Sequence, residues 1–87
     1  MIIMGDETLK FLQRSKYRPL LLKSLENEVL MPKEISQHCG IRISHVSKVL
    51  AELKSKELIE ILNPEEYKGR LYRLSDKGIY YLKKLDE

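Results

Sequence analysis

The sequence predicts a single α+β domain that is mainly helical, and three observations support this prediction. First, 87 residues suffice for one domain with one modest core. Second, apolar residues recur at helical spacing up to about residue 56, and only then does the period change to that of strands. Third, a content of 43% hydrophobic and 33% charged residues is ordinary for a folded protein. Because the sequence has no repeat or linker, we expect one continuous domain over residues 1–87.

The first helical region covers residues 6 to about 27. Proline lacks an N–H and clashes with the preceding turn, so Pro19 cannot lie in a helix interior. We expect either a break near Ser15 or a second helical piece with Pro19 in its first turn. Both alternatives place Tyr17 and Arg18 near a helix start.

Two further helices are expected between residue 32 and about residue 56. Pro32 opens the first of them at a position where proline is tolerated, and Gly40 closes it as a left-handed cap. Met31 precedes that helix and leaves it without a side-chain cap. Ser44 is the expected N-cap of the second helix. One apolar stripe of that helix repeats at the spacing i, i+3, i+4 and i+7 and consists of Val46, Val49, Leu50 and Leu53.

A hairpin and a last helix complete the chain. Residues 58–62 and 71–74 read as strands, and the turn-rich segment between them contains the dipeptides NP and KG. Ser75 is the expected cap of a final helix over residues 76–85. The expected core takes apolar residues from every element: Leu21, Leu25, Ile35, Val46, Val49, Leu50, Leu53, Ile59, Tyr72 and Leu74.

This order of elements is that of a winged helix-turn-helix domain. It has a three-helix core, a two-stranded wing and a C-terminal helix, with the helix-turn-helix at about 32–56 and the wing at about 58–74. The positive charge supports the same interpretation, because the whole net excess of +3 is found within residues 41–56. That stretch carries Arg42, Lys48, Lys54 and Lys56 against Glu52 alone. A local cationic excess attracts a polyanion.

Two segments carry a resemblance to a known family. EISQHCGIRISHVSKVLAELKSKELIE resembles the helix-turn-helix of MarR/ArsR-like winged helix regulators, and GRLYRLSDKG resembles their wing signature. Over about residues 15–80 the chain is similar to a small archaeal-type branch of that group. The resemblance implies a sequence-specific transcriptional regulator that binds double-stranded DNA, with its recognition helix in the major groove and its wing on the backbone or minor groove.

The chain departs from the family pattern at two positions. Met31 stands where Ser or Thr is frequent, and Glu57 stands where a glycine usually follows the recognition helix. A left-handed conformation at Glu57 costs about 1 kcal/mol for a residue other than glycine, so we expect that helix end to be shaped differently.

Candidate DNA contacts fall into three groups. At the start of the basic helix we expect His45, Ser47 and Lys48 to meet base edges or nearby phosphates, and Arg42 to meet a phosphate. Ser44 either contacts a phosphate or only caps its helix. The other two groups lie in the wing and in the flanking helices, and they consist of Lys68, Arg70 and Arg73, and of Tyr17, Arg18 and Lys33.

The resemblance assigns specific roles to some of these residues. Tyr17 and Arg18 correspond to the family's phosphate anchor, and Arg70 corresponds to the position that enters the minor groove. We expect Arg73 to point outward toward a phosphate and Tyr67 to pack across the base of the wing. Glu65 and Glu66, in the same loop, must face away from the DNA.

Other classes of function are less well supported. The sequence contains no nucleophile–base–acid set and no glycine-rich phosphate loop, so we expect neither an enzyme nor a cofactor. The two histidines and Cys39 do not form a zinc-binding pattern, and we expect no metal site. No apolar run is long enough to span a membrane, which favours a cytoplasmic, unprocessed chain. The alternative is a winged helix that binds another protein.

We also expect a homodimer. Apolar residues of the first and last helices form the candidate dimer surface: Leu9, Phe11, Leu12, Ile79, Leu82 and Leu85. The opposing interpretation is that they only cover the core of a monomer. A small-molecule effector is neither predicted nor excluded by the sequence.

Overall fold

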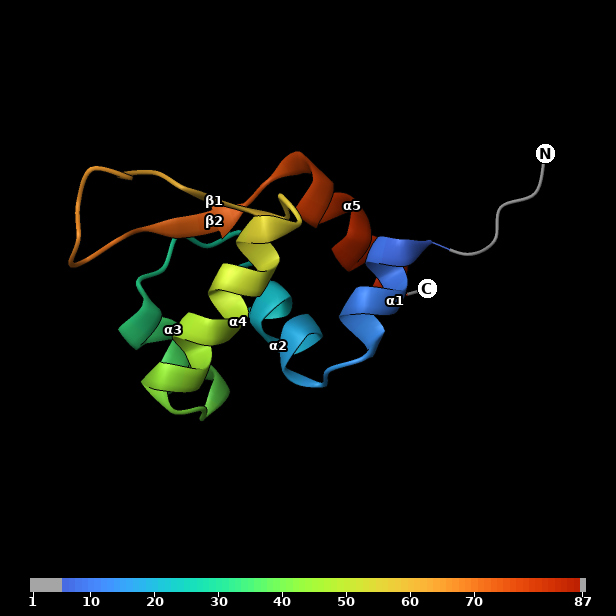
Figure 1. The fold of residues 1–87 in the computed structure, drawn as a ribbon, viewed down its shortest axis with the longest axis horizontal. Coiled ribbons are helices and arrows are strands. Elements are labelled where there is room, and N and C mark those ends of the chain that lie inside the picture. The colour runs from blue at the N-terminus through green and yellow to red at the C-terminus, as the bar shows by residue number, and fades with distance from the viewer. Residues whose placement is uncertain (1–5, 87) are drawn as a thin grey trace.

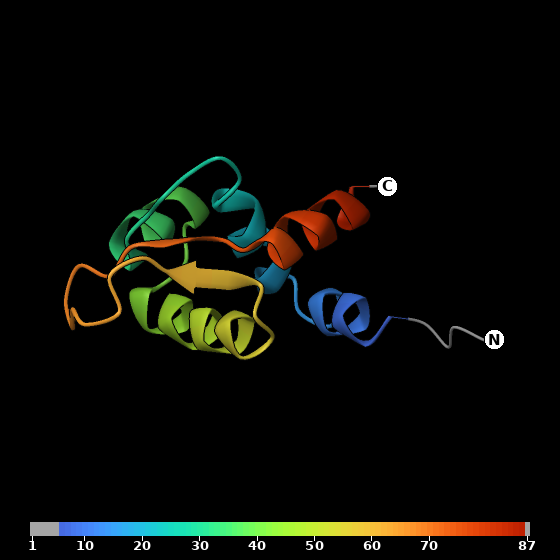
Figure 2. The ribbon, with the colours of Figure 1, turned by 90° about the horizontal axis from the view of Figure 1, so that it is seen from above.

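The computed structural model describes residues 6–86, so residues 1–5 and 87 of the expected domain lie outside the described part. The elements follow the predicted order: α1 (Glu7–Gln13), α2 (Tyr17–Ser24), α3 (Pro32–Cys39), α4 (Ile43–Ser55), β1 (Ile59–Ile61), β2 (Tyr72–Leu74) and α5 (Asp76–Leu85). Helices α3 and α4 lie with the wing at one end of the molecule, and α1 lies at the other end (Figure 1, Figure 2). The predicted winged helix-turn-helix architecture is confirmed.

The first helical region is divided as expected. Helix α1 ends at Gln13, and α2 begins at Tyr17, which places Pro19 in the first turn of α2. Both alternatives for this region therefore hold together, because the chain breaks around Ser15 and the proline lies where its missing N–H has no helical partner to lose. The Oγ of Ser15 accepts a hydrogen bond from the backbone N–H of Tyr17 at 3.2 Å.

As expected, the Met31 side chain does not cap α3, whereas the N-cap of α4 differs from the sequence-based expectation. Although Met31 has no capping side chain, its backbone N–H donates to the carboxylate of Glu34 at 2.7 Å, and α3 is thereby capped from within. Ser44 is not the cap of α4, and that prediction is wrong. The N-cap is Arg42, with extended backbone and no side-chain cap, so Ser44 is the second helical residue. The turn is set by Gly40, whose φ is +67°.

The end of α4 keeps the left-handed shape that its sequence disfavours. Glu57 has a φ of +60°, so the expectation of a differently shaped helix end is wrong. Leu58 N–H donates to the carbonyl of Leu53 at 3.1 Å, which closes the helix end. The carbonyl of Glu57 accepts a hydrogen bond from the Oγ of Ser75 at 2.6 Å. Tertiary contacts thus hold a residue in a conformation that costs it free energy.

The wing is an antiparallel pair in which Ile59, Glu60 and Ile61 face Leu74, Arg73 and Tyr72. Its strands are shorter than predicted, at three residues each. On its other side, β2 is extended by an isolated bridge to Leu30 in the α2–α3 connection. Two backbone hydrogen bonds of 3.0 and 2.9 Å join Leu30 and Tyr72. The base of the wing is therefore tied to the segment that leads into α3.

The core lies between the helices and the sheet, and nine of the ten predicted core residues are buried in it, while Tyr72 is partly buried. Six further apolar residues complete it: Leu12, Leu22, Leu30, Ile41, Leu58 and Leu82. Leu12 and Leu82 were expected on a dimer surface, but both are buried within this chain. The prediction is wrong for these two residues, because α1 and α5 pack on each other and on α2. No helix of residues 6–86 is long and apolar enough to cross a membrane.

Candidate nucleic-acid interface

The exposed face of α4 is polar and basic at its N-terminal end. Ser44, Ser47 and Lys48 are exposed, while the stripe of Val46, Val49, Leu50 and Leu53 is buried against the core. Residues spaced by three or four positions share one side of a helix, so these three side chains form one surface. The first turn of α4 contains no acidic residue. This surface can donate hydrogen bonds to a polyanion and attract it by its positive charge.

The structure places an apolar residue, Ile43, at the start of this surface. It is the first residue of α4 and 48% of its surface is exposed. The sequence-based reasoning missed it, because a helix capped by Ser44 would leave Ile43 outside the helix. An exposed aliphatic group at the groove-facing end of a recognition helix can contact the methyl group of thymine.

Tyr17, at the start of α2, lies against α4. Its ring contacts the imidazole of His45 in an edge-on arrangement, with ring centroids 4.4 Å apart and an interplanar angle of 65°. The ammonium group of Lys16 lies 5.4 Å from the centroid of the Tyr17 ring. The two candidate contacts Tyr17 and His45, which are far apart in sequence, are thus brought together.

Arg18 is engaged within the protein. Its Nε is 3.1 Å from the Oε1 of Glu52 on α4, and its Nη1 donates to the carbonyl of Phe11 at 2.7 Å. The guanidinium carbon lies 4.0 Å from the centroid of the Phe11 ring. With only 17% of its side chain exposed, Arg18 braces α1, α2 and α4 in this structure. Its expected role as a phosphate anchor remains a prediction.

The wing loop is organised by a side chain that the sequence-based reasoning did not single out. Asn63 donates from Nδ2 to the carbonyl of Gly69 at 3.2 Å and accepts from the N–H of Leu71 at 2.8 Å. Arg70 folds back into the same loop, where Nε donates to the carbonyl of Glu66 at 2.6 Å. The signal available in the sequence was the Asn-Pro pair, since asparagine side chains readily bond to nearby backbone.

The tip of the wing is exposed. Tyr67 is 94% exposed, so the prediction that it packs across the wing base is wrong. The loop satisfies its backbone through Asn63 and Arg70, which leaves the ring outside. Lys68 is exposed beside it, and Gly69 adopts a φ of +68°.

The remaining candidates lie apart from one another. Lys33 is exposed in the first turn of α3. Arg73 is also exposed, on the sheet, but its Nε pairs with the Oε1 of Glu60 on the neighbouring strand at 2.9 Å. Arg73 is thus exposed as expected but paired along the sheet, and its contact with a phosphate remains a prediction.

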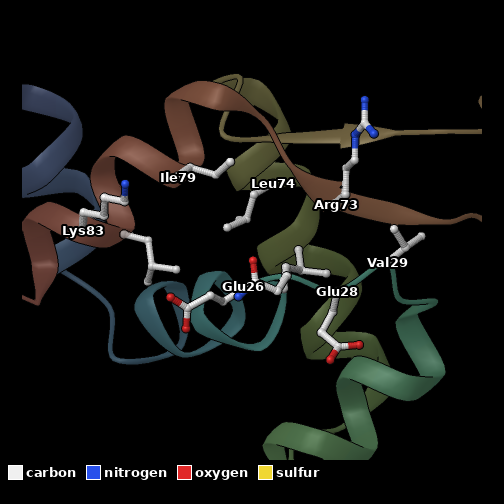
Figure 3. Close-up of a pocket in the computed structure, with 10 residues that line it drawn as sticks. Glu26, Glu28, Val29, Arg73, Leu74, Ile79 and Lys83 are labelled. Carbon is white, nitrogen blue, oxygen red and sulfur yellow. The ribbon is translucent and has the colours of Figure 1, made fainter.

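A hollow of about 490 Å³ lies between the end of α2, β2 and α5 (Figure 3). Leu74 and Ile79 contribute to its apolar part, and Glu26 and Lys83 to its charged rim. Arg73 lines one side, but its guanidinium points away from the hollow. Among residues 6–86 no three His, Cys, Asp or Glu side chains form a group that could hold a metal ion.

No protein-family model matches the chain, and no curated protein matches it in sequence. Solved structures, in contrast, superpose on it well. The reduced form of the transcriptional regulator YodB from B. subtilis has a TM-score of 0.79 at 24% identity, and the match covers 99% of this chain and 86% of that one.

Two longer proteins give similar agreement. The PcaV transcriptional regulator from Streptomyces coelicolor, solved with its natural ligand, has a TM-score of 0.73 at 22% identity, covering 83% of this chain and 52% of that one. A cysteine-to-serine mutant of MarR from E. coli, solved with operator DNA, has a TM-score of 0.73 at 24% identity, covering 90% and 57%. The chain therefore spans little more than half the length of PcaV and MarR. The resemblance noted in the sequence is confirmed for the fold, and the chain has the winged helix-turn-helix fold of MarR-type transcriptional regulators.

Proposed function

We propose that this chain is a cytoplasmic transcriptional regulator that binds double-stranded DNA in a sequence-specific way and has no enzymatic activity. One observation carries the proposal: the exposed basic start of α4 lies at the same end of the molecule as the wing (Figure 1). An α-helix fills the major groove, and an adjacent hairpin reaches the backbone or minor groove. A similar fold solved on operator DNA, that of MarR from E. coli, supports this arrangement.

We assign the contacts from the positions of the candidate residues on α4, α3 and the wing. His45, Ser47 and Lys48 meet base edges, while Ile43 meets a thymine methyl group. Arg42, Ser44 and the flanking Lys33 meet phosphates, and Lys68 brings the wing to the backbone. Arg70 reaches the minor groove only by leaving the loop carbonyls that it now bonds, so its contribution to affinity is reduced by that cost.

We further propose that the regulator works as a homodimer on two half-sites about 34 Å apart, one helical turn of DNA. Apolar side chains that remain exposed on α5 support this proposal. Ile79 is 42% exposed and Tyr80 is 53% exposed. Ile79 thus stays in the candidate dimer surface and Tyr80 joins it, while the buried Leu12 and Leu82 leave it.

The proposal is tested by selecting genomic fragments with the purified full chain and titrating the enriched duplex at two salt concentrations. We expect one inverted repeat to be enriched and its affinity to fall as salt rises, since each phosphate contact releases counterions. Lys48→Ala should change the base preference. Arg73→Ala is the matched control, because the loss of a cation from the Glu60 pair should leave the preference unchanged.

Two results would count against the proposal. Weak, uniform binding without enrichment would favour the alternative, a winged helix that binds another protein, and a partner would then be sought by pull-down. If Lys48→Ala changed neither affinity nor preference, α4 would not be the reading helix.

A further inference from the structure

The contact between Tyr17 and His45 joins the start of α2 to the first turn of α4. Tyr17 is partly buried against the core, and its backbone N–H is bonded to Ser15. The ring is therefore held by its own helix and by the link that precedes it. Tyrosine has only two side-chain torsions, so a packed ring is a stiff support.

His45 is the third residue of α4 and is half-buried. Within residues 6–86 the imidazole makes a ring contact with Tyr17 and no hydrogen bond. Side chains of a helix lean toward its N-terminus, which for α4 is the end that enters the groove. The imidazole nitrogens thus remain available for a ligand, while one side of the ring rests on Tyr17.

We propose that Tyr17 is a positioning residue for sequence discrimination, which fixes the orientation of the His45 imidazole so that it reads one base edge. This inference rests on the proposed function and deepens it. Tyr17 contributes through its ring and without contacting the DNA, whereas the family resemblance implied a direct phosphate contact. Hydrogen bonds to base edges depend on orientation, so a freely rotating imidazole discriminates less than a fixed one.

The test uses the enriched duplex and a set of duplexes in which each base pair is replaced in turn. Affinities are compared for the wild-type chain, Tyr17→Phe, Tyr17→Leu, His45→Ala and the double variant Tyr17→Leu/His45→Ala. Phenylalanine keeps the ring and removes the hydroxyl, and leucine removes the ring and keeps an apolar side chain. Tyr17→Met serves as a second ring-free variant in case Tyr17→Leu does not fold. Circular dichroism verifies the fold of each variant.

We expect Tyr17→Phe to keep the wild-type preference. Tyr17→Leu should reduce discrimination by roughly threefold to tenfold, the strength of an edge-on ring pair, at the same base pair as His45→Ala. On the His45→Ala background it should have no further effect there, since the two residues act as one unit.

Three outcomes would overturn the inference. A uniform loss of affinity with Tyr17→Phe would assign the hydroxyl to a phosphate. Independent, additive effects of Tyr17→Leu and His45→Ala would show that Tyr17 does not act through His45. An unchanged base preference in both ring-free variants would show the same. Failure of the proposed function is recognised differently, since the wild-type chain itself would then enrich no duplex.

Discussion

Arg18 and Glu52 form an ion pair of 3.1 Å that connects the start of α2 with the C-terminal half of α4. The same guanidinium bonds the carbonyl of Phe11 at the end of α1. Three helices therefore meet at one side chain, and α4 is held in place by an ion pair as well as by apolar packing.

Removal of this brace should destabilise the domain measurably. We expect Arg18→Ala to lower the free energy of unfolding by about 2 kcal/mol, since it removes charged hydrogen bonds from a poorly exposed site. Urea denaturation measures the change. Arg73→Ala is the matched control, because it breaks a more exposed pair with Glu60 and should cost less than about 1 kcal/mol. Equal losses in both variants would contradict the bracing role.

Gly78 should not tolerate any side chain. A Cβ at this position would lie 2.0 Å from the carbonyl oxygen of Leu58, where α5 crosses the start of β1. Alanine favours a helix interior over glycine by about 1 kcal/mol, but overpacking against backbone costs about 1–3 kcal/mol. Since a backbone oxygen at 2.0 Å cannot rotate aside, we expect the upper end of that cost, about 3 kcal/mol. After the helix gain of about 1 kcal/mol, Gly78→Ala should destabilise the domain by about 2 kcal/mol in urea denaturation.

Gly40 provides the comparison for that substitution. Nothing lies within 4 Å of a Cβ built there, and its φ of +67° is the only obstacle to a side chain. Gly40→Ala should therefore cost only the left-handed penalty of about 1 kcal/mol. A smaller loss for Gly78→Ala than for Gly40→Ala would show that α5 can shift away from Leu58.

The left-handed Glu57 offers a route to higher stability. Glycine adopts this conformation without the penalty, so Glu57→Gly should raise the free energy of unfolding by about 0.5–1 kcal/mol and the Tm by about 4 °C. Thermal unfolding followed by circular dichroism measures it. Glu57→Ala removes the same charge but keeps the strain, so a gain of equal size in that variant would point to charge and not to backbone.

A hydrogen bond between the two ends of the described chain should make stability depend on pH. The hydroxyl of Tyr81 donates to the carboxylate of Asp6 at 2.6 Å. This bond is the main reason that the pKa of Asp6 is lower than its usual value of 3.8, and it also raises the pKa of Tyr81 above 10.0. The ionised carboxylate and the protonated phenol are therefore both favoured by folding.

The two shifts act at opposite ends of the pH range. The contribution of Asp6 is complete above about pH 5 and is lost as the pH falls through the folded-state pKa. That of Tyr81 is complete below about pH 9 and is lost as the pH rises through its own folded-state pKa. Asp6→Asn removes the ionisable group, while asparagine can still cap the helix. In urea denaturation, the free energy of unfolding of this variant should be lower than that of the wild-type chain at neutral pH, and the difference should shrink as the pH falls below about 4. A deficit that stays constant down to pH 2 would exclude the linkage.

Local signals were sufficient to predict much of this fold. Helix α5 has the bounds expected from its Ser75 cap and apolar repeat, and α3 has those expected from Pro32 and Gly40. These features act over a few residues, so they can be read directly from the sequence. The fold class followed from their order.

Features that depend on distant residues could not be predicted in this way. The partner of Arg18 is 34 residues away, and no periodicity in the sequence relates the two. Ser44 has a side chain typical of an N-cap, but after the turn at Gly40 the helix already begins at Ile43, which makes Arg42 the N-cap. Similarly, the fold of the wing loop around Asn63 decides where Arg70 and Tyr67 point.

The bridge between Leu30 and Tyr72 has a consequence for self-association of the folded chain. An unpaired strand edge is a template for pairing with other chains, and proteins protect such edges with short strands and charges. Here β2 is paired with β1 on one side and with Leu30 on the other. Its partner β1 spans only three residues and carries the charged Glu60 at its centre. The sheet should therefore resist edge-to-edge aggregation, even though it has so few strands.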